Sequence, residues 1–538
     1  MAAKKRDSEL PKTMTEHEAL MWNIEKDPWL NPNGASLTIL DQPVDMERFR
    51  RHIKYGVTKM PRLHQRVAPG LGRFTTPAWA PDPEFDFDYH VRQVELPAPG
   101  TERQLLDLAA RLYEEPLDRT RPLWRFVAIS GIEGGKGAVW AETHHVIADG
   151  IGQLRMAELY QQISRDEPMP DDIDLTEFVA KQVAAHSSSS TQADSITGLF
   201  TSVAKVVDDV VRQQAGIGRR MVGELMMLPA DPSRVATKGG SLVAAVQSAG
   251  ELLTGGGNEV SGGSPLWKNR SRQRRLEYVR VPLEDLKTAA KALGGTVNDA
   301  FMVGLTEGAV RYHQKRDTVV DAFNTSFVVS TRSDNSIGGN SFTPVPVQVG
   351  GQQASFKKRM TEIRQTAENA RAKSARSGGI SGMSGVINLL PTSVVTSTAR
   401  KQGAHIDFAT SNLRGAPFPL YCAGAKVLGT VCMGPLAGTA ANATALSNDG
   451  HFDIGLFIDP KAIVDGEDYR RCVESAFVDM IESAIPKQAP VAKNASPEKP
   501  SPKKPGPKKS VSKKSTAAKS TARKAPAKKS TSKQSVSS

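Results

Sequence analysis

The sequence has 538 residues, enough for roughly two to four domains, and its 39% hydrophobic and 24% charged residues are ordinary for a globular protein with a sizeable core. The three cysteines, an odd number without metal-ligand spacing, exclude a disulfide framework and suit a reducing cytosol. The sequence has no apolar signal core at its start and no run of about 18 apolar residues, so we expect neither export nor a membrane-spanning helix.

The net charge of +13 is concentrated at the C-terminal end. Residues 486–538 contain 14 Lys, one Arg and one Glu, a net charge of +14, so the remaining residues sum to −1. This segment has almost no large apolar residue and is predicted to be disordered. It could bind nucleic acid through phosphate charge, contact an anionic membrane or lipid-droplet surface, or act only as a solubilising tail.

Residues 1–170 alternate helical and strand patterns separated by turn signals, which predicts an N-terminal α/β domain. Pro61 and Pro116 would end the first two helices. The predicted elements are helices at 46–63, 101–117 and 150–164 and strands at 125–130 and 138–145.

The composition changes in residues 171–265, where Ser-rich and Gly-rich stretches flank an amphipathic helical pattern at 196–214. We interpret this region as an interdomain connection with helices of its own. A second α/β unit follows at 266–485. Its predicted elements are strands at 274–283, 326–332 and 344–350, helices at 284–295, 296–314 and 354–372, further strands, and a closing helix at 468–485.

Two adjacent histidines, His144 and His145, end the predicted strand at 138–145. Side chains alternate along a strand, so the two imidazoles should point to opposite faces, and only one could enter a given cleft. Asp149 could cap the helix that follows or pair with an arginine, and Gly150 could take a positive φ in a sharp turn. Both histidines could also be purely structural.

The stretch from His144 to Gly150 matches the HHxxxDG motif of coenzyme A-dependent acyltransferases. Other blocks resemble, in the same order along the chain, the PLxxxRPLW, Asn-Asp, Gly-Asn and Ser-Asn-Val-Pro-Gly-Pro blocks of the bacterial wax ester synthase/diacylglycerol acyltransferase family. These blocks lie at 116–124, 296–301, 338–347 and 410–427. The resemblance covers roughly residues 14–485 and is to an actinobacterial-type member of the family with a Lys-rich C-terminal tail. Arg414 and Ala416 stand where the last block usually has prolines.

The resemblance implies an α/β fold of two chloramphenicol acetyltransferase-like domains, with mixed sheets and flanking helices around a central tunnel. Acyl-CoA, a co-substrate, would enter from one side and diacylglycerol or a long-chain alcohol from the other. No metal and no permanently bound cofactor is implied. His145 would be the general base, since a neutral imidazole titrates near the operating pH. His144, Asp149 and Gly150 would support the loop.

Asn298 is the candidate oxyanion donor by the same resemblance. Thr296 and Asp299 are spaced as a capping box, which gives Asp299 a structural interpretation and leaves Asn298 open between the two roles. Arg332, at the end of a predicted strand, could be the partner of Asp149.

The leading hypothesis is an O-acyltransferase that forms triacylglycerol or wax ester, in the cytoplasm and peripherally on the inner membrane or a lipid droplet. The alternatives are acylation of another hydroxyl acceptor and a non-catalytic protein that binds lipid droplets or polyanions.

Overall fold

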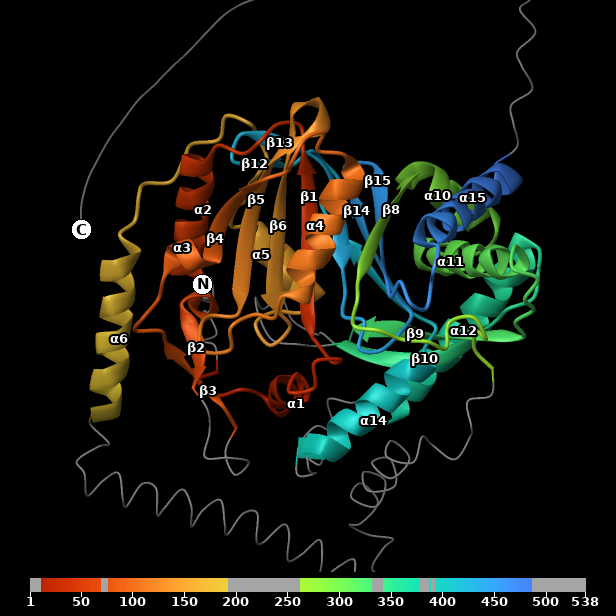
Figure 1. Cartoon of the computed structure of the whole chain (residues 1–538), viewed down its shortest axis with the longest axis horizontal. Coiled ribbons are helices and arrows are strands. Elements are labelled where there is room, and N and C mark those ends of the chain that lie inside the picture. The colour runs from red at the N-terminus through yellow and green to blue at the C-terminus, as the bar shows by residue number, and fades with distance from the viewer. Residues whose placement is uncertain are drawn as a thin grey trace, which may run out of the picture. The chain divides into compact units, whose positions relative to one another are not determined.

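A computed structural model describes residues 11–68, 76–191, 262–330, 342–377, 387–388 and 392–485 (Figure 1). The Lys-rich tail, the predicted helix at 196–214 and Arg332 lie outside the described residues. Predictions that concern them therefore remain predictions.

The first sheet is mixed and has seven strands. Its β4–β5 pair is parallel, and the other pairs are antiparallel. The strands are, in spatial order, β4 (Val91–Glu95), β5 (Trp124–Ile132), β6 (Lys136–His144), β1 (Asn33–Leu40), β13 (Ala425–Met433), β12 (Tyr421–Cys422) and β7 (Gln161–Gln162).

The second sheet, also mixed, has six strands. Here β11 is parallel to both β9 and β14, whereas the remaining pairs are antiparallel. In spatial order the strands are β10 (Phe342–Gly350), β9 (Ala322–Ser330), β11 (Phe408–Arg414), β14 (Ala441–Asn448), β15 (His451–Ile458) and β8 (Arg275–Pro282). A separate two-stranded sheet pairs β2 (Gln65–Ala68) with β3 (Ala78–Pro81).

The sheets do not divide along the domain boundaries predicted from the sequence. After β11 the chain crosses to the first sheet, where β13 pairs with β1 from Ala35↔Met433 to Leu40↔Val427, and then returns to form β14. Strand β13, which belongs to residues 266–485, therefore lies next to β1, the strand nearest the N-terminus. The two halves are joined by backbone hydrogen bonds as well as by side-chain packing.

Helices cover both sheets, and the described helices agree with most of those predicted. The longer ones are α1 (Glu16–Ile24), α2 (Met46–Lys59), α4 (Glu102–Glu114), α5 (Gly150–Ala157), α6 (Leu175–Thr191), α10 (Leu283–Ala292), α11 (Val297–Gln314), α12 (Phe356–Ser377), α14 (Thr392–His405) and α15 (Gly466–Ala484). Figure 1 shows α10, α11 and α15 together beside β8 and β15, and α14 lies near α1.

The first sheet buries both of its faces, because apolar clusters cover the side chains that alternate between them. On β6, Val139 and Ala141 belong to an apolar cluster that includes α2 and α5, whereas Ala138 and Trp140 belong to a cluster with α4. The second sheet forms its own cluster with α11 and α15. No helix among the described residues is sufficiently long and apolar to cross a membrane.

Candidate active site

The two histidines lie where β6 ends. The strand stops at His144, and His145 is already in the turn that follows, so strand alternation does not extend to it as predicted. The turn closes on His144, because the Ile147 N–H donates to its carbonyl oxygen (2.9 Å) and the Val146 N–H donates to its Nδ1 (3.0 Å). The turn, rather than the pleat, determines how the two imidazoles are placed.

His144 is fully buried and held by residues of the first segment. Because Nδ1 accepts a hydrogen bond, the neutral ring carries its proton on Nε2, which lies 3.3 Å from Glu25 Oε2. Arg119 Nη1 is 2.8 Å from the same carboxylate oxygen, and the Trp22 ring meets His144 edge-on. These contacts fix the tautomer and orientation of His144, which suits a supporting role.

A second buried polar cluster lies on β6 next to His144. Glu142 is 1% exposed, with Arg125 Nη2 3.0 Å from Oε2 and Asn33 Nδ2 donating to Oε1 at 2.8 Å. Burial raises the pKa of Glu142, and the Arg125 guanidinium opposes that shift. Asn33 also pairs with His144 across the β1–β6 ladder, so this cluster holds the strand end that carries the motif.

His145 is 8% exposed. The pKa of His145 is lowered to about 4, mainly by burial and also by the neighbouring His144 and His17, whereas the Asp149 carboxylate acts in the opposite direction. The sequence motif alone predicts a pKa near the operating pH, and burial accounts for the lower value. The imidazole is therefore neutral at pH 7 and able to accept a proton.

Asp149 caps α5, one of the two predicted alternatives. Its side chain accepts the Gly152 N–H at 2.9 Å, and it is 4% exposed. Arg332, the partner considered in the other alternative, lies outside the described residues. Asp149 therefore fixes the start of α5 and also influences His145 electrostatically.

Gly150 opens α5 and does not adopt the positive φ that the sequence allowed. A Cβ at this position would lie 3.0 Å from Leu413 Cδ2 and 3.4 Å from its Cδ1. Glycine is therefore placed here by close approach to β11 rather than by backbone handedness.

Asn298 and Asp299 lie in the first turn of α11. Asp299 and Thr296 form the predicted capping box, in which Thr296 N and Oγ1 both donate to Asp299 Oδ2 at 2.8 Å. This confirms a structural role for Asp299. Asn298 is half-buried, and its Oδ1 lies 3.5 Å from Nδ2 of Asn412 on β11. The end of β11 thus contacts both the α5 motif and the start of α11.

Comparison with known families agrees with these motifs. A sequence model of the wax ester synthase/diacylglycerol acyltransferase catalytic domain matches residues 14–301, and one of the family's C-terminal domain matches residues 338–481. The chain belongs to the wax ester synthase/diacylglycerol acyltransferase family. It is an acyl-CoA-dependent O-acyltransferase of the type that forms triacylglycerol or wax ester.

Relatives and solved structures support the assignment. The chain is 29% identical over 475 residues to a Mycobacterium tuberculosis protein, Rv2484c, named as a diacylglycerol O-acyltransferase, covering 86% of this chain and 91% of that protein. It is 26% identical to tgs1 of the same organism, covering 85% and 93%. The solved wax ester synthase/diacylglycerol acyltransferase of Marinobacter aquaeolei VT8 has the same fold, with a TM-score of 0.56, 18% identity and coverage of 88% of this chain and 99% of that one.

A condensation domain of the calcium-dependent antibiotic synthetase has a related fold, with a TM-score of 0.50 and 15% identity, covering 89% of this chain and 97% of that domain. The expected α/β architecture of the acyltransferase family is therefore confirmed.

Several residues that surround the family motif carry no signal in the sequence. Glu25 and Trp22 contact His144 from the N-terminal segment, and Asn412 and Leu413 reach the motif and α11 from β11. A half-buried glutamate after a short helix gives no local signal. The 410–427 block resembles a family block, but its sequence does not indicate which residues it contacts.

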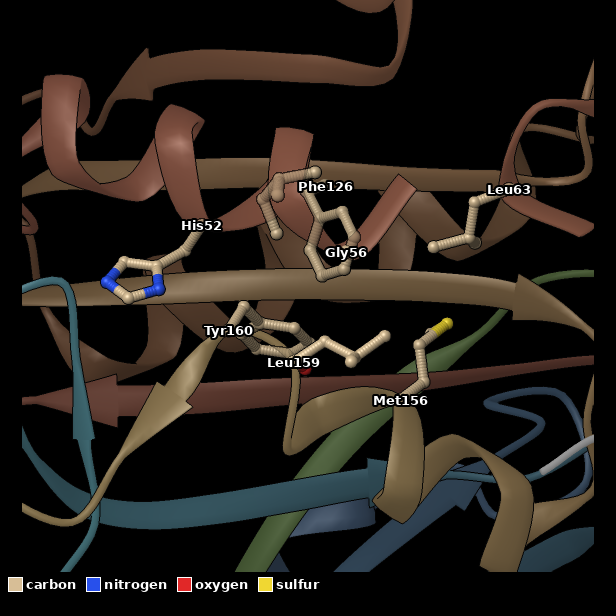
Figure 2. Close-up of a pocket in the computed structure, with 8 residues that line it drawn as sticks. His52, Gly56, Leu63, Phe126, Met156, Leu159 and Tyr160 are labelled. Carbon is tan, nitrogen blue, oxygen red and sulfur yellow. The ribbon is translucent and has the colours of Figure 1, made fainter. Parts of the chain in front are cut away.

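The cavities in the described part of the chain include the following two. One of about 10 Å³ lies between α2 and the end of α5 (Figure 2); it is lined by His52, Ile53, Gly56, Leu63, Phe126, Met156, Leu159 and Tyr160. An open hollow of about 330 Å³ is lined by Ile163, Phe418, Pro419 and Tyr421. Neither is lined by a motif residue, so the central tunnel stays a prediction. Among the described residues, no group of three or more His, Cys, Asp or Glu side chains could hold a metal ion.

Proposed function

We propose that His145 is the general base in the transfer of a long-chain acyl group from acyl-CoA to a hydroxyl acceptor. The observation that carries this proposal is a buried imidazole, neutral at pH 7, in the family motif and under the influence of the Asp149 carboxylate. An alcohol is a poor nucleophile until a base takes its proton, and a neutral imidazole can do so.

In this mechanism His145 accepts the hydroxyl proton while the alcohol oxygen forms a bond to the thioester carbonyl carbon. The resulting tetrahedral oxyanion needs a donor, and Asn298 is the candidate because it lies at the start of α11, where the helix dipole favours negative charge. When the carbon–sulfur bond breaks, coenzyme A leaves as a thiolate and takes the proton from the imidazolium. The products are an ester and free coenzyme A.

The other motif residues support this base. His144 would fix the turn through its contacts with Val146 and Glu25, and Asp149 would fix the start of α5. Asp149 would also stabilise the imidazolium that forms on His145, because its charge raises the pKa of that ring.

Diacylglycerol is the acceptor that we favour, because the relatives from Mycobacterium tuberculosis are named as diacylglycerol O-acyltransferases. A fatty alcohol is the alternative, since the family model and the Marinobacter aquaeolei protein are named for both activities. The intact HHxxxDG motif argues against a non-catalytic binding protein. Acyl-CoA is a co-substrate in each case.

The direct test uses radiolabelled palmitoyl-CoA with diacylglycerol or hexadecanol, and separates the products by thin-layer chromatography. The parent protein should form labelled triacylglycerol faster than wax ester. His145→Ala should lose about 10²–10⁴-fold in rate, the usual contribution of a positioned base, while keeping the parent circular dichroism spectrum. Near-normal turnover by the folded variant would exclude His145 as the base, and absence of both products from the parent would exclude both acceptors.

Peripheral attachment through the tail completes the proposal. The +14 charge of residues 486–538 would attract an anionic membrane or lipid-droplet surface and would also bind nucleic acid. A chain truncated after Ile485 should esterify soluble substrates at the parent rate and co-sediment far less with anionic vesicles. Full-length protein that binds DNA but not vesicles, at two salt concentrations, would favour nucleic acid as the partner of the tail.

A further inference from the structure

The first turn of α11 divides its polar tasks between two neighbouring side chains. Asp299 is buried and takes the Thr296 N–H and O–H, so it completes the helix cap. Asn298 takes no part in that capping box. Its side chain is half-buried, and its Oδ1 faces Nδ2 of Asn412 at 3.5 Å.

The chemistry of an amide gives this contact a direction. The nitrogen of an asparagine side chain only donates, and the oxygen only accepts. When Asn412 donates to Oδ1 of Asn298, the carbonyl end of Asn298 is engaged and its NH₂ group is turned away from Asn412. The amide of Asn298 is then oriented as a donor toward any acceptor on its other side.

We propose that Asn412 is a positioning residue for the acyl transfer, because it sets the side-chain amide of Asn298 with its NH₂ group toward the oxyanion. This inference rests on the role of Asn298 proposed above.

The position of β11 supports the proposal. Asn412 directly precedes Leu413, whose Cδ2 lies 3.0 Å from the place of a Cβ on Gly150, so one strand end contacts both the HHxxxDG helix and α11. Asn412 is exposed, and its contact with Asn298 is long. Hydrogen bonds of catalytic groups can tighten from such a distance in the Michaelis complex.

The decisive variant is Asn412→Asp, which keeps the size of the side chain but cannot donate when ionised. Asn298 would then turn its NH₂ group toward the carboxylate and present its carbonyl oxygen to the oxyanion. We expect kcat to fall about 10²–10³-fold, as when an oxyanion donor is removed, with the KM for acyl-CoA changed by less than about threefold.

A double-mutant cycle separates orientation from the added negative charge. Asn298→Ala should match the kcat loss of Asn412→Asp, and the double variant should be no slower than Asn298→Ala alone, because nothing remains to be oriented. Direct repulsion of the oxyanion by the new carboxylate would make the double variant slower than Asn298→Ala. The uncharged Asn412→Leu, expected to lose kcat without a change in KM, keeps the test valid if Asn412→Asp does not fold.

A matched amide pair on the surface is the control. Gln365 Nε2 donates to Asn369 Oδ1 at 3.2 Å on α12, and Gln365→Glu should leave kcat unchanged. A folded Asn412→Asp with kcat within about threefold of the parent, or multiplicative losses in the double variant, would overturn the role of Asn412. Normal kcat for Asn298→Ala would exclude Asn298 as the oxyanion donor and would overturn this inference. Ester formation by the parent protein would still support the proposed acyl transfer.

Discussion

At the scale of single residues, burial is what sets the chemistry of His145. The ring is 8% exposed, and burial lowers its pKa from the ordinary 6.5 to about 4. The base is protonated only below that value, so kcat/KM should be flat from about pH 8 to 5 and should fall as the pH approaches 4. A profile of kcat/KM for acyl-CoA against pH checks this expectation, and a midpoint near 6.5 would mean that His145 is solvated during the reaction.

Acid unfolding must be measured alongside that profile. The unfolded chain takes up a proton at His145 below pH 6.5, whereas the native chain does so only near pH 4. The free energy of unfolding should therefore fall as the pH drops through this interval, because the unfolded state binds more protons. His90 and His313, whose pKa values burial also lowers to about 4, act in the same direction. Urea titrations at each pH would show where loss of rate reflects loss of fold.

Asp149 combines a cap with a charge, and two substitutions separate these contributions. Asp149→Ala removes the acceptor of the Gly152 N–H and should lower the free energy of unfolding by about 0.5–2 kcal/mol. Asp149→Asn can still cap α5 but lacks the carboxylate that raises the pKa of His145. It should remain nearly as stable as the parent while losing rate. Denaturant unfolding and kcat report the two effects independently, and equal instability of both variants would argue against this division.

At the scale of elements, the contact between α5 and β11 brings a strand of the C-terminal half against the helix that begins at the HHxxxDG motif. The glycine at position 150 leaves room for Leu413, whose Cδ2 would lie only 3.0 Å from an added Cβ. The strand therefore sits closer to the helix than any larger residue would allow.

Gly150→Ala should lower activity without unfolding the protein. Alanine favours a helix by up to about 1 kcal/mol over glycine, which offsets part of the clash, while displacement of β11 misplaces groups at the site. We expect about a 10–100-fold loss in kcat, of the size that a misplacement of about 1 Å produces. Adding Leu413→Ala should restore much of the rate, with Leu413→Ala alone as the control. If the Gly150→Ala, Leu413→Ala double variant did not recover activity, the added methyl group would act other than through its clash with Leu413.

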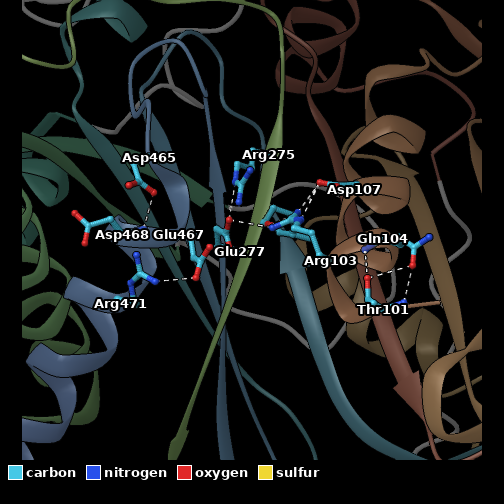
Figure 3. A network of polar contacts seen from close by, with 11 residues as sticks. Thr101, Arg103, Gln104, Asp107, Arg275, Glu277, Asp465, Glu467, Asp468 and Arg471 are labelled. Carbon is cyan, nitrogen blue, oxygen red and sulfur yellow. Dashed lines mark hydrogen bonds and ion pairs between the residues drawn. The ribbon is translucent and has the colours of Figure 1, made fainter. Parts of the chain in front are cut away.

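At the scale of the whole molecule, backbone and side-chain contacts tie the two sheets together. Strand β13 crosses into the first sheet, and a polar cluster joins α4 to β8 (Figure 3). Glu277 has a 4% exposed side chain, and its Oε1 lies 2.9 Å from Arg103 Nη1 and 2.6 Å from Arg275 Nε. Arg103 also donates to the Leu276 carbonyl at 2.9 Å.

Glu277→Gln should therefore destabilise the protein by about 1.5–3 kcal/mol, because it removes charge from hydrogen bonds to a buried group. The matched control is Glu467→Gln, which breaks an exposed ion pair with Arg471 within one helix and should cost about 0.3–0.5 kcal/mol. Both midpoints can be read from urea unfolding, which should show one cooperative transition because the chain passes from the second sheet into the first at β13 and then returns. Equal effects of the two substitutions would show that the cluster does not hold the halves together.

Local patterns in the sequence determined much of this protein. Apolar spacing gave α2 and α4 nearly at their observed bounds, the Thr296–Asp299 spacing gave the capping box, and the HHxxxDG motif gave the family and the candidate base. These features depend on residues within a few positions of one another, so the chain encodes them directly.

Only the tertiary structure decided what surrounds the motif. The contacts of Glu25 with His144, Leu413 with Gly150 and Asn412 with Asn298 join residues more than 100 positions apart. They follow from the crossing of β13 and from the register of the two sheets, which no local pattern specifies. The predicted end of β6 is wrong for a different reason, since the turn forms through local hydrogen bonds to His144 that the alternation of apolar residues does not indicate. The low pKa of His145 likewise comes from burial by distant segments, and burial is a property of the folded chain.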